Sequence, residues 1–97
     1  MYMKIHRNLA GDEVVAVCDR ELLNTTVSSG DLEIHISEPF YGGRLSSEDE
    51  VTKVLVRAGN VNIMGERSVA LAVGLGLVDT DGCIRIGPAL HAQIIRL

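Results

Sequence analysis

The sequence contains few of the residues that mark specialised small domains. Its 97 residues include no tryptophan, two prolines, two cysteines and only three aromatic side chains. Cys18 and Cys83 are too few and too far apart for a disulfide framework or for the close ligand spacing of a zinc site. The longest uncharged run, from Ser68 to Val78, has about half of the roughly 20 residues that span a bilayer. These shortages argue against a disulfide-stapled domain and against a membrane-spanning segment.

Positive charge is also scarce. Nine lysines and arginines stand against 13 aspartates and glutamates, which gives a net charge of −4 and a pI near 5.2. This balance argues against broad binding to nucleic acid or to a membrane surface, although it leaves room for a local basic patch. The sequence opens with the strand-like run Met1–Ile5 and shows no signal peptide, so we expect a cytoplasmic protein without a membrane partner.

The apolar pattern predicts a single α+β domain over residues 1–97, in which a small mixed, largely antiparallel sheet packs against two main helices. Hydrophobic residues make up 46% and charged residues 23%, as in folded domains. The expected strands are Tyr2–Arg7, Glu13–Cys18, Asp31–Ser37, Asn60–Met64, Cys83–Gly87 and Leu90–Leu97. The first two suggest an antiparallel hairpin, and the second takes a central position because its apolar run is continuous. The last strand is a candidate for a sheet edge.

Two helices are indicated by their start and stop residues. Ser46 or Ser47 caps the first, and its acidic start Glu48–Glu50 suits the positive end of the helix dipole. We interpret that acidic run as helix-start chemistry and not as a metal site. The second helix begins at Gly65 and ends at Gly74–Gly76. It is apolar on more than one face, so we expect it to be buried.

The loop before the first helix has the most unusual composition in the chain. It places Phe40 and Tyr41 side by side, followed by Gly42, Gly43 and Arg44. One interpretation is a recognition loop, in which the aromatic rings stack on a base or hold a peptide. The other is a structural turn, in which Phe40 is buried and the glycines serve only the turn. The sequence leaves both interpretations open.

The start of the second helix is a candidate anion site. Backbone N–H groups following Gly65 would join the Arg67 side chain and the Ser68 hydroxyl around a bound anion. The competing interpretation is that Glu66 caps its own helix and that Arg67 is a solvated side chain. We favour the second interpretation, because the Glu66 carboxylate would repel an anion.

No catalytic site, metal site or cofactor is predicted. Cys18 beside Asp19 offers material for a nucleophilic thiolate, but a cysteine at the end of an apolar strand usually behaves as an inert hydrophobe. Asp19 is instead expected to cap a short helix over Glu21–Leu23. The potential metal ligands are scattered singly, at Cys18, Cys83, His6, His35 and His91. No phosphate loop or dinucleotide fingerprint is present, so an enzyme ranks last among the possible functions.

Several short blocks carry a resemblance to a known family: Ala16–Asp19, Phe40–Gly43, Gly65–Val69 and His91–Gln93. In this order, over nearly the whole chain, they are similar to the small archaeal family catalogued as domain of unknown function 424. The resemblance implies an α+β domain in an archaeal cytosolic protein, a link to translation genes, and no catalytic residue to carry over. The family pattern has a proline directly before the histidine, whereas here two residues separate Pro88 from His91. A site shaped by that pair would therefore differ in this chain.

Two functions remain as expectations. The first is a non-catalytic binding module for RNA or a ribonucleoprotein in translation, in which the aromatic pair stacks and Arg44, Arg67 and Arg7 meet phosphate. The second is a protein-interaction or small-ligand domain, or a homo-oligomer, in which the Phe40–Arg44 loop and His91 line a pocket or a dimer surface. The candidate binding residues are Phe40, Tyr41, Gly42, Gly43, Arg44, Gly65, Arg67, Ser68 and His91.

Overall fold

The computed structural model describes residues 1–96; Leu97, the last residue of the predicted final strand, lies outside the described residues. The strands are β1 (Tyr2–Arg7), β2 (Glu13–Cys18), β3 (Thr26–Ser29), β4 (Leu32–His35), β5 (Arg44–Leu45), β6 (Asn60–Met64), β7 (Ile84–Ile86) and β8 (Ala89–Ile95). The helices are α1 (Glu38–Tyr41), α2 (Glu48–Leu55) and α3 (Glu66–Gly74), with single 3-10 turns η1 (Arg20–Leu22) and η2 (Thr80–Gly82).

Six strands form one sheet in the order β5-β1-β2-β6-β8-β7, and β3 pairs with β4 in a separate hairpin. The pair β2–β6 is parallel, and the other described pairs are antiparallel. The α+β class and the mixed, largely antiparallel sheet are therefore confirmed. The hairpin of β1 and β2 and the central position of β2 are confirmed as well.

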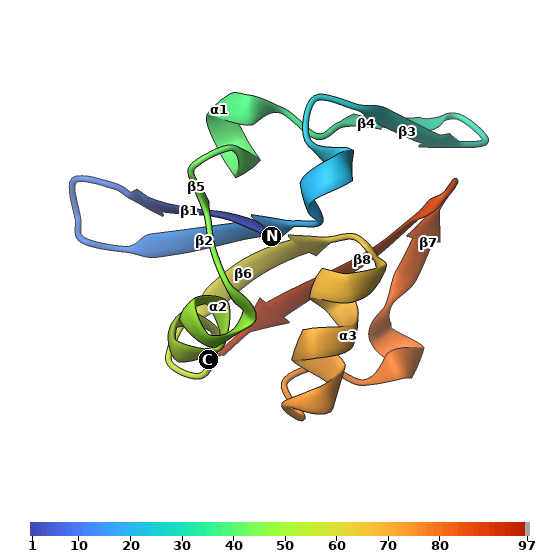
Figure 1. Cartoon of the computed structure of the whole chain (residues 1–97). Coiled ribbons are helices and arrows are strands. Elements are labelled where there is room, and N and C mark those ends of the chain that lie inside the picture. The colour runs from blue at the N-terminus through green and yellow to red at the C-terminus, as the bar shows by residue number, and fades with distance from the viewer. Residues whose placement is uncertain (97) are drawn as a thin grey trace.

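The large sheet separates two hydrophobic clusters (Figure 1). Helices α2 and α3 cover one face, and α1 with the β3–β4 hairpin covers the other. Strand β2 supplies both clusters, because successive side chains of a strand point to opposite faces. Val15 and Val17 pack in the cluster of α2 and α3, while Ala16 and Cys18 pack in the cluster of α1 and the hairpin.

The expected edge position of the last strand is wrong. Strand β8 lies between β6 and β7, because the chain reverses at Gly87–Pro88 and lays β7 along its outer side. Gly87 has φ 58°, and a side chain there would overlap the carbonyl of Ser28 on β3. The turn therefore packs closely against the small hairpin. Strand β3 and helix α1 have no counterpart among the sequence predictions: β3 buries only Val27, and α1 is a single turn.

The start of α2 confirms the predicted capping chemistry. The Ser47 hydroxyl accepts a hydrogen bond from the Glu50 N–H at 3.2 Å, and the Glu50 carboxylate accepts one from the Ser47 N–H at 3.0 Å. The acidic run Glu48–Glu50 thus forms the first helical turn. In residues 1–96 no three potential metal ligands converge. Within the same range, no helix combines the length and the apolar character that a membrane crossing requires.

Candidate functional site

The start of α3 binds a carboxylate of the chain itself. Asp19 is only 3% exposed, and its Oδ1 accepts hydrogen bonds from the Ser68 N–H at 2.8 Å and the Ser68 hydroxyl at 2.7 Å. Its Oδ2 accepts a third hydrogen bond, from the Arg67 N–H at 3.1 Å. The position that the sequence suggests for a bound anion is therefore filled by Asp19. The free backbone N–H groups and the positive end of the helix dipole favour this carboxylate, as they would favour a phosphate.

The parallel pairing of β2 and β6 brings these residues together. Both strands end at the same edge of the sheet, where Asp19 follows β2 and Gly65 follows β6. The Asp19 N–H donates to the Met64 carbonyl at 2.9 Å, which holds the two strand ends together. Gly65 has φ 117°, and a Cβ on it would lie 2.5 Å from Asp19 Oδ2. Glycine is thus required here both by backbone geometry and by space.

Two expectations for this region are corrected. Glu66 does not cap its own helix, because its carboxylate forms an ion pair with Arg85 at 2.6 Å. Asp19 makes no side-chain cap at η1 and caps α3 instead. Arg67, expected to be a solvated side chain, is mostly exposed and forms an ion pair with Glu21.

The Phe40–Arg44 segment matches neither of its two interpretations completely. Tyr41, and not Phe40, is the buried ring, at 6% exposure. Burial raises the pKa of the Tyr41 hydroxyl to about 12, with a smaller contribution from Cys18. Phe40 is half-buried and stacks on His6, with ring centroids 4.9 Å apart and planes 16° apart. The His6 Nε2–H also donates to the Phe40 carbonyl at 2.8 Å.

The two glycines of this segment serve close packing. A Cβ on Gly43 would lie 2.5 Å from the Met3 carbonyl of β1, and one on Gly42 would lie 2.5 Å from Glu38 Cγ. Arg44, on β5, keeps 80% of its side chain exposed and lies 3.7 Å from the Glu50 carboxylate. These contacts favour a structural turn, with Arg44 as its one open polar group.

His91 joins the helix start and not the aromatic segment. Its Nδ1–H donates to the Ile63 carbonyl at 2.9 Å, and it pairs across the sheet with Met64. The neighbouring Leu90 carbonyl accepts the Gly65 N–H at 2.7 Å. The structure thus places Gly65, Arg67, Ser68 and His91 around the end of β6, whereas the Phe40–Arg44 segment packs over β1 and β2.

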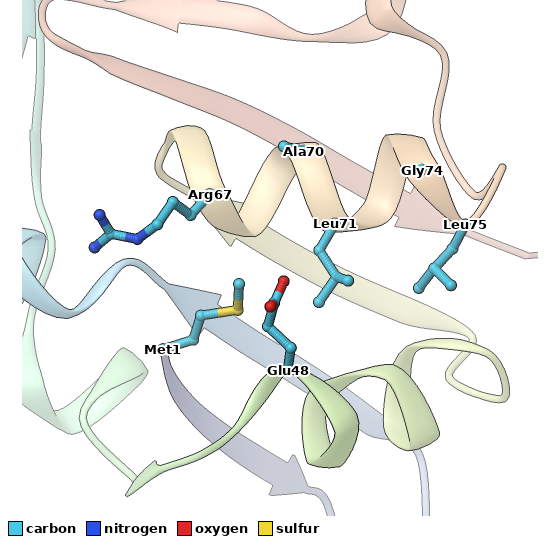
Figure 2. A pocket seen from close by; sticks show the side chains of 7 residues that line it. All are labelled: Met1, Glu48, Arg67, Ala70, Leu71, Gly74 and Leu75. Carbon is cyan, nitrogen blue, oxygen red and sulfur yellow. The ribbon is translucent and has the colours of Figure 1, made fainter.

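A site that the sequence analysis missed lies between α2 and α3. An open groove of about 640 Å³ separates the start of α2 from one side of α3 (Figure 2). Its lining residues are Met1, Glu48, Arg67, Ala70, Leu71, Gly74 and Leu75. Figure 2 shows Leu71 and Leu75 pointing from α3 into the gap, opposite Met1 and Glu48. We call this feature the α2–α3 groove.

The groove exists because α3 is apolar on two faces. Ser68, Val69 and Ala72 form the buried face. Arg67, Ala70, Leu71, Gly74 and Leu75 follow one another at helical spacing on the groove face. The expectation that this helix is buried therefore holds for one face only. On the groove side, Leu71 and Leu75 pack against the same hydrophobic cluster but stay partly exposed, and Ala70 and Gly74 are exposed. The signal was present in the sequence, since one buried face does not require so many apolar residues.

A second open surface lies on the opposite face of the sheet. The strand register places Lys4, Ala16, Asn62 and Gln93 in one row across β1, β2, β6 and β8. Lys4 and Asn62 are partly exposed, and Gln93 is exposed. In the next row, Asn60 Oδ1 lies 3.5 Å from Gln93 Nε2. Carboxamide side chains therefore reach solvent from two inner strands of the sheet.

Cys18 has no sign of an activated thiol. Its side chain is 0% exposed, and burial, with the nearby Asp19 charge, raises the pKa of the thiol to about 11. A reactive cysteine has the opposite properties, namely access to solvent and a lowered pKa. Cys18 therefore behaves as part of the core.

The fold of this chain is similar to that of a protein whose crystal structure is known. The crystal structure of an uncharacterized conserved protein from Methanopyrus kandleri is similar, with a TM-score of 0.77 and 28% sequence identity over 99% of this chain and 93% of that chain. No curated protein matches the chain. Residues 7–97 match the family described as "Protein of unknown function (DUF424)", which confirms the resemblance carried by the short sequence blocks: the chain belongs to this family.

Proposed function

We propose that the protein is a non-catalytic binding module that holds an apolar segment of a partner protein in the α2–α3 groove. The second apolar face of α3 carries this proposal. Grooves of this size, lined by apolar side chains with a few polar groups at the rim, are typical ligand sites. Apolar surface gains about 25 cal/mol for each Å² removed from water, so a segment laid along Leu71 and Leu75 would be stabilised. The site is thus an example of segment-in-groove recognition.

The charges of the protein support a protein ligand over a nucleic acid. Four of the seven arginines, Arg7, Arg44, Arg67 and Arg85, lie beside a carboxylate. Phosphate binding would have to replace these ion pairs. Tyr41, one half of the expected stacking platform, is buried in the core. The net charge of −4 also disfavours a polyanion.

The proposal is tested by selecting a displayed random peptide library on the immobilised protein. We expect the selected peptides to be rich in apolar residues and to bind Leu75→Lys at least about tenfold more weakly. Gly74→Leu, which fills the groove without removing a side chain, should have the same effect. Ile84→Lys is the matched control, because Ile84 is an exposed apolar residue on β7. Failure to select any peptide, or equal binding to all variants, would refute the proposal.

One observation favours a second candidate, a cytoplasmic module that binds RNA or a ribonucleoprotein in translation. The open carboxamides Asn62 and Gln93, the Lys4 amine and the stacked pair His6–Phe40 lie on one side of the large sheet. Sheet faces that bind single-stranded RNA combine polar groups with rings on which bases stack. This version places the site on the sheet, and not on Tyr41 or Arg67.

Fluorescence anisotropy with a labelled single-stranded RNA separates the two candidates. The RNA module predicts binding that weakens with salt and that falls in Lys4→Ala and Phe40→Ala. The Leu75→Lys variant should bind RNA as well as the wild-type protein. Absence of binding at low salt would eliminate this candidate and leave the protein-binding module in place.

A further inference from the structure

We infer that the segment held in the α2–α3 groove is basic and amphipathic, with a lysine or arginine that pairs with Glu48. The inference rests on the proposed function, because it names the chemistry of the ligand for the same groove. Two properties of the groove carry it: the balance of charge among its lining groups, and the shape of its apolar wall.

The two charged side chains that line the groove are in different electrostatic states. The guanidinium of Arg67 forms an ion pair with Glu21, and in Figure 2 it extends away from Leu71 and Leu75. Glu48 has no cationic partner among residues 1–96. Its carboxylate sits in the first turn of α2, where the helix dipole stabilises it, and in Figure 2 it faces the gap. Glu48 is thus the charged side chain of the lining that remains to be matched by a ligand.

The surroundings of Glu48 do not supply a cation. Asp49 follows in the same helical turn, and Glu50 is engaged with Ser47 and approached by Arg44. Met1 also lines the groove, but its amino group donates to the Ser46 carbonyl at 3.4 Å and makes no ion pair within the described chain. An acidic ligand would therefore meet repulsion at this rim, whereas a basic one would gain a partner.

The apolar wall sets the length and pattern of the ligand. The groove residues of α3 run from Arg67 to Leu75, a rise of about 12 Å at about 1.5 Å per residue. Ala70 and Gly74, one turn apart, are the small residues of this wall and lie beside the row of the larger side chains of Leu71 and Leu75. A segment of about two helical turns, with bulky apolar side chains placed against the small residues Ala70 and Gly74, fits this wall. Its basic residue then lies at the Glu48 end.

Parallel peptide selections on wild-type protein and on Glu48→Lys test this inference. Peptides selected on the wild type should combine apolar residues with an excess of lysine or arginine, and should bind Glu48→Lys about tenfold more weakly. Glu48→Gln should give a smaller loss, and the loss should shrink with added salt. Selection on Glu48→Lys should favour acidic peptides. Glu33→Lys is the matched control, because it makes the same charge change at an exposed site on the β3–β4 hairpin, across the sheet.

The outcomes separate this inference from the proposed function. If selected peptides depend on Leu75 but show no basic excess and tolerate Glu48→Lys, the groove binds apolar segments and the inference fails alone. If they tolerate Leu75→Lys as well, the groove is not the binding site and both fail. If the protein dimerises in sedimentation equilibrium and Leu75→Lys restores the monomer, the occupant is a second copy of the chain. That result would also overturn the inference.

Discussion

The carboxylate of Asp19 occupies the space that a side chain at position 65 would need. A Cβ on Gly65 would lie 2.5 Å from Asp19 Oδ2, although 46 positions separate the two residues in the sequence. The glycine and the aspartate are therefore a matched pair: one leaves room for the other, and the aspartate closes the start of α3. The helix start at Gly65, which resembles an anion site in the sequence, is in fact closed by an internal cap from Asp19.

Gly65→Ala should destabilise the protein by about 2–4 kcal/mol. The substitution combines an unfavourable positive φ with an overlap against a buried side chain. Urea unfolding followed by circular dichroism measures the change. Gly74→Ala is the matched control, because nothing lies within 4 Å of its Cβ position and no positive φ is required there. It should leave stability unchanged or raise it by up to about 1 kcal/mol. Equal effects of both substitutions would contradict this account.

Asp19→Ala should cost about 1–3 kcal/mol of unfolding free energy, because it leaves the Arg67 and Ser68 N–H groups without their acceptor. Asp19→Asn should cost less, since the amide oxygen still accepts one of these hydrogen bonds. Chemical denaturation at a fixed neutral pH compares the variants. If Asp19→Ala is as stable as the wild type, the carboxylate is not the functional cap of α3.

The hydroxyl of Tyr41 should remain protonated in the folded protein well above the pH at which free tyrosine ionises. Burial raises its pKa to about 12, from an ordinary value of 10. Because the pKa is higher in the folded than in the unfolded state, the stabilisation from the buried, protonated Tyr41 is complete below pH 10. It is lost as the pH rises toward 12. Tyr41→Phe should lack this alkaline loss. A spectrophotometric titration of the tyrosines, run on both proteins, measures the difference. Normal ionisation of Tyr41 would contradict its burial.

The two cysteines should differ sharply in reactivity toward a thiol reagent in the native state. Cys83 is partly exposed, whereas Cys18 is buried and has a raised thiol pKa. We expect one rapid equivalent of modification in the wild type and almost none in Cys83→Ser, until denaturant is added. Mass spectrometry of the modified peptides identifies the site. Rapid native labelling of Cys18 would show that the hydrophobic cluster under α1 and the β3–β4 hairpin opens readily.

Local sequence signals predicted the elements that depend on neighbouring residues. The capping box of α2 spans only Ser47 to Glu50, and Gly65, Gly74 and Gly76 mark the ends of α3 within one short stretch. Alternation and a continuous apolar run predicted β1 and β2 and the central place of β2. Strand β3 escaped prediction because a strand with one buried residue, Val27, has no periodic signal.

The sequence by itself determined the fold class, the family and the position of both main helices, because each is written in local patterns of apolar residues, caps and glycines. Only the tertiary structure decided which partner each pattern meets. The parallel pairing of β2 with β6 carries Asp19 to the start of α3, and the turn at Gly87 moves β8 away from the sheet edge. The same packing buries one apolar face of α3 and leaves the other partly exposed along the α2–α3 groove. The hydrophobic effect favours burial of an apolar face, but the arrangement of distant elements determines what buries it.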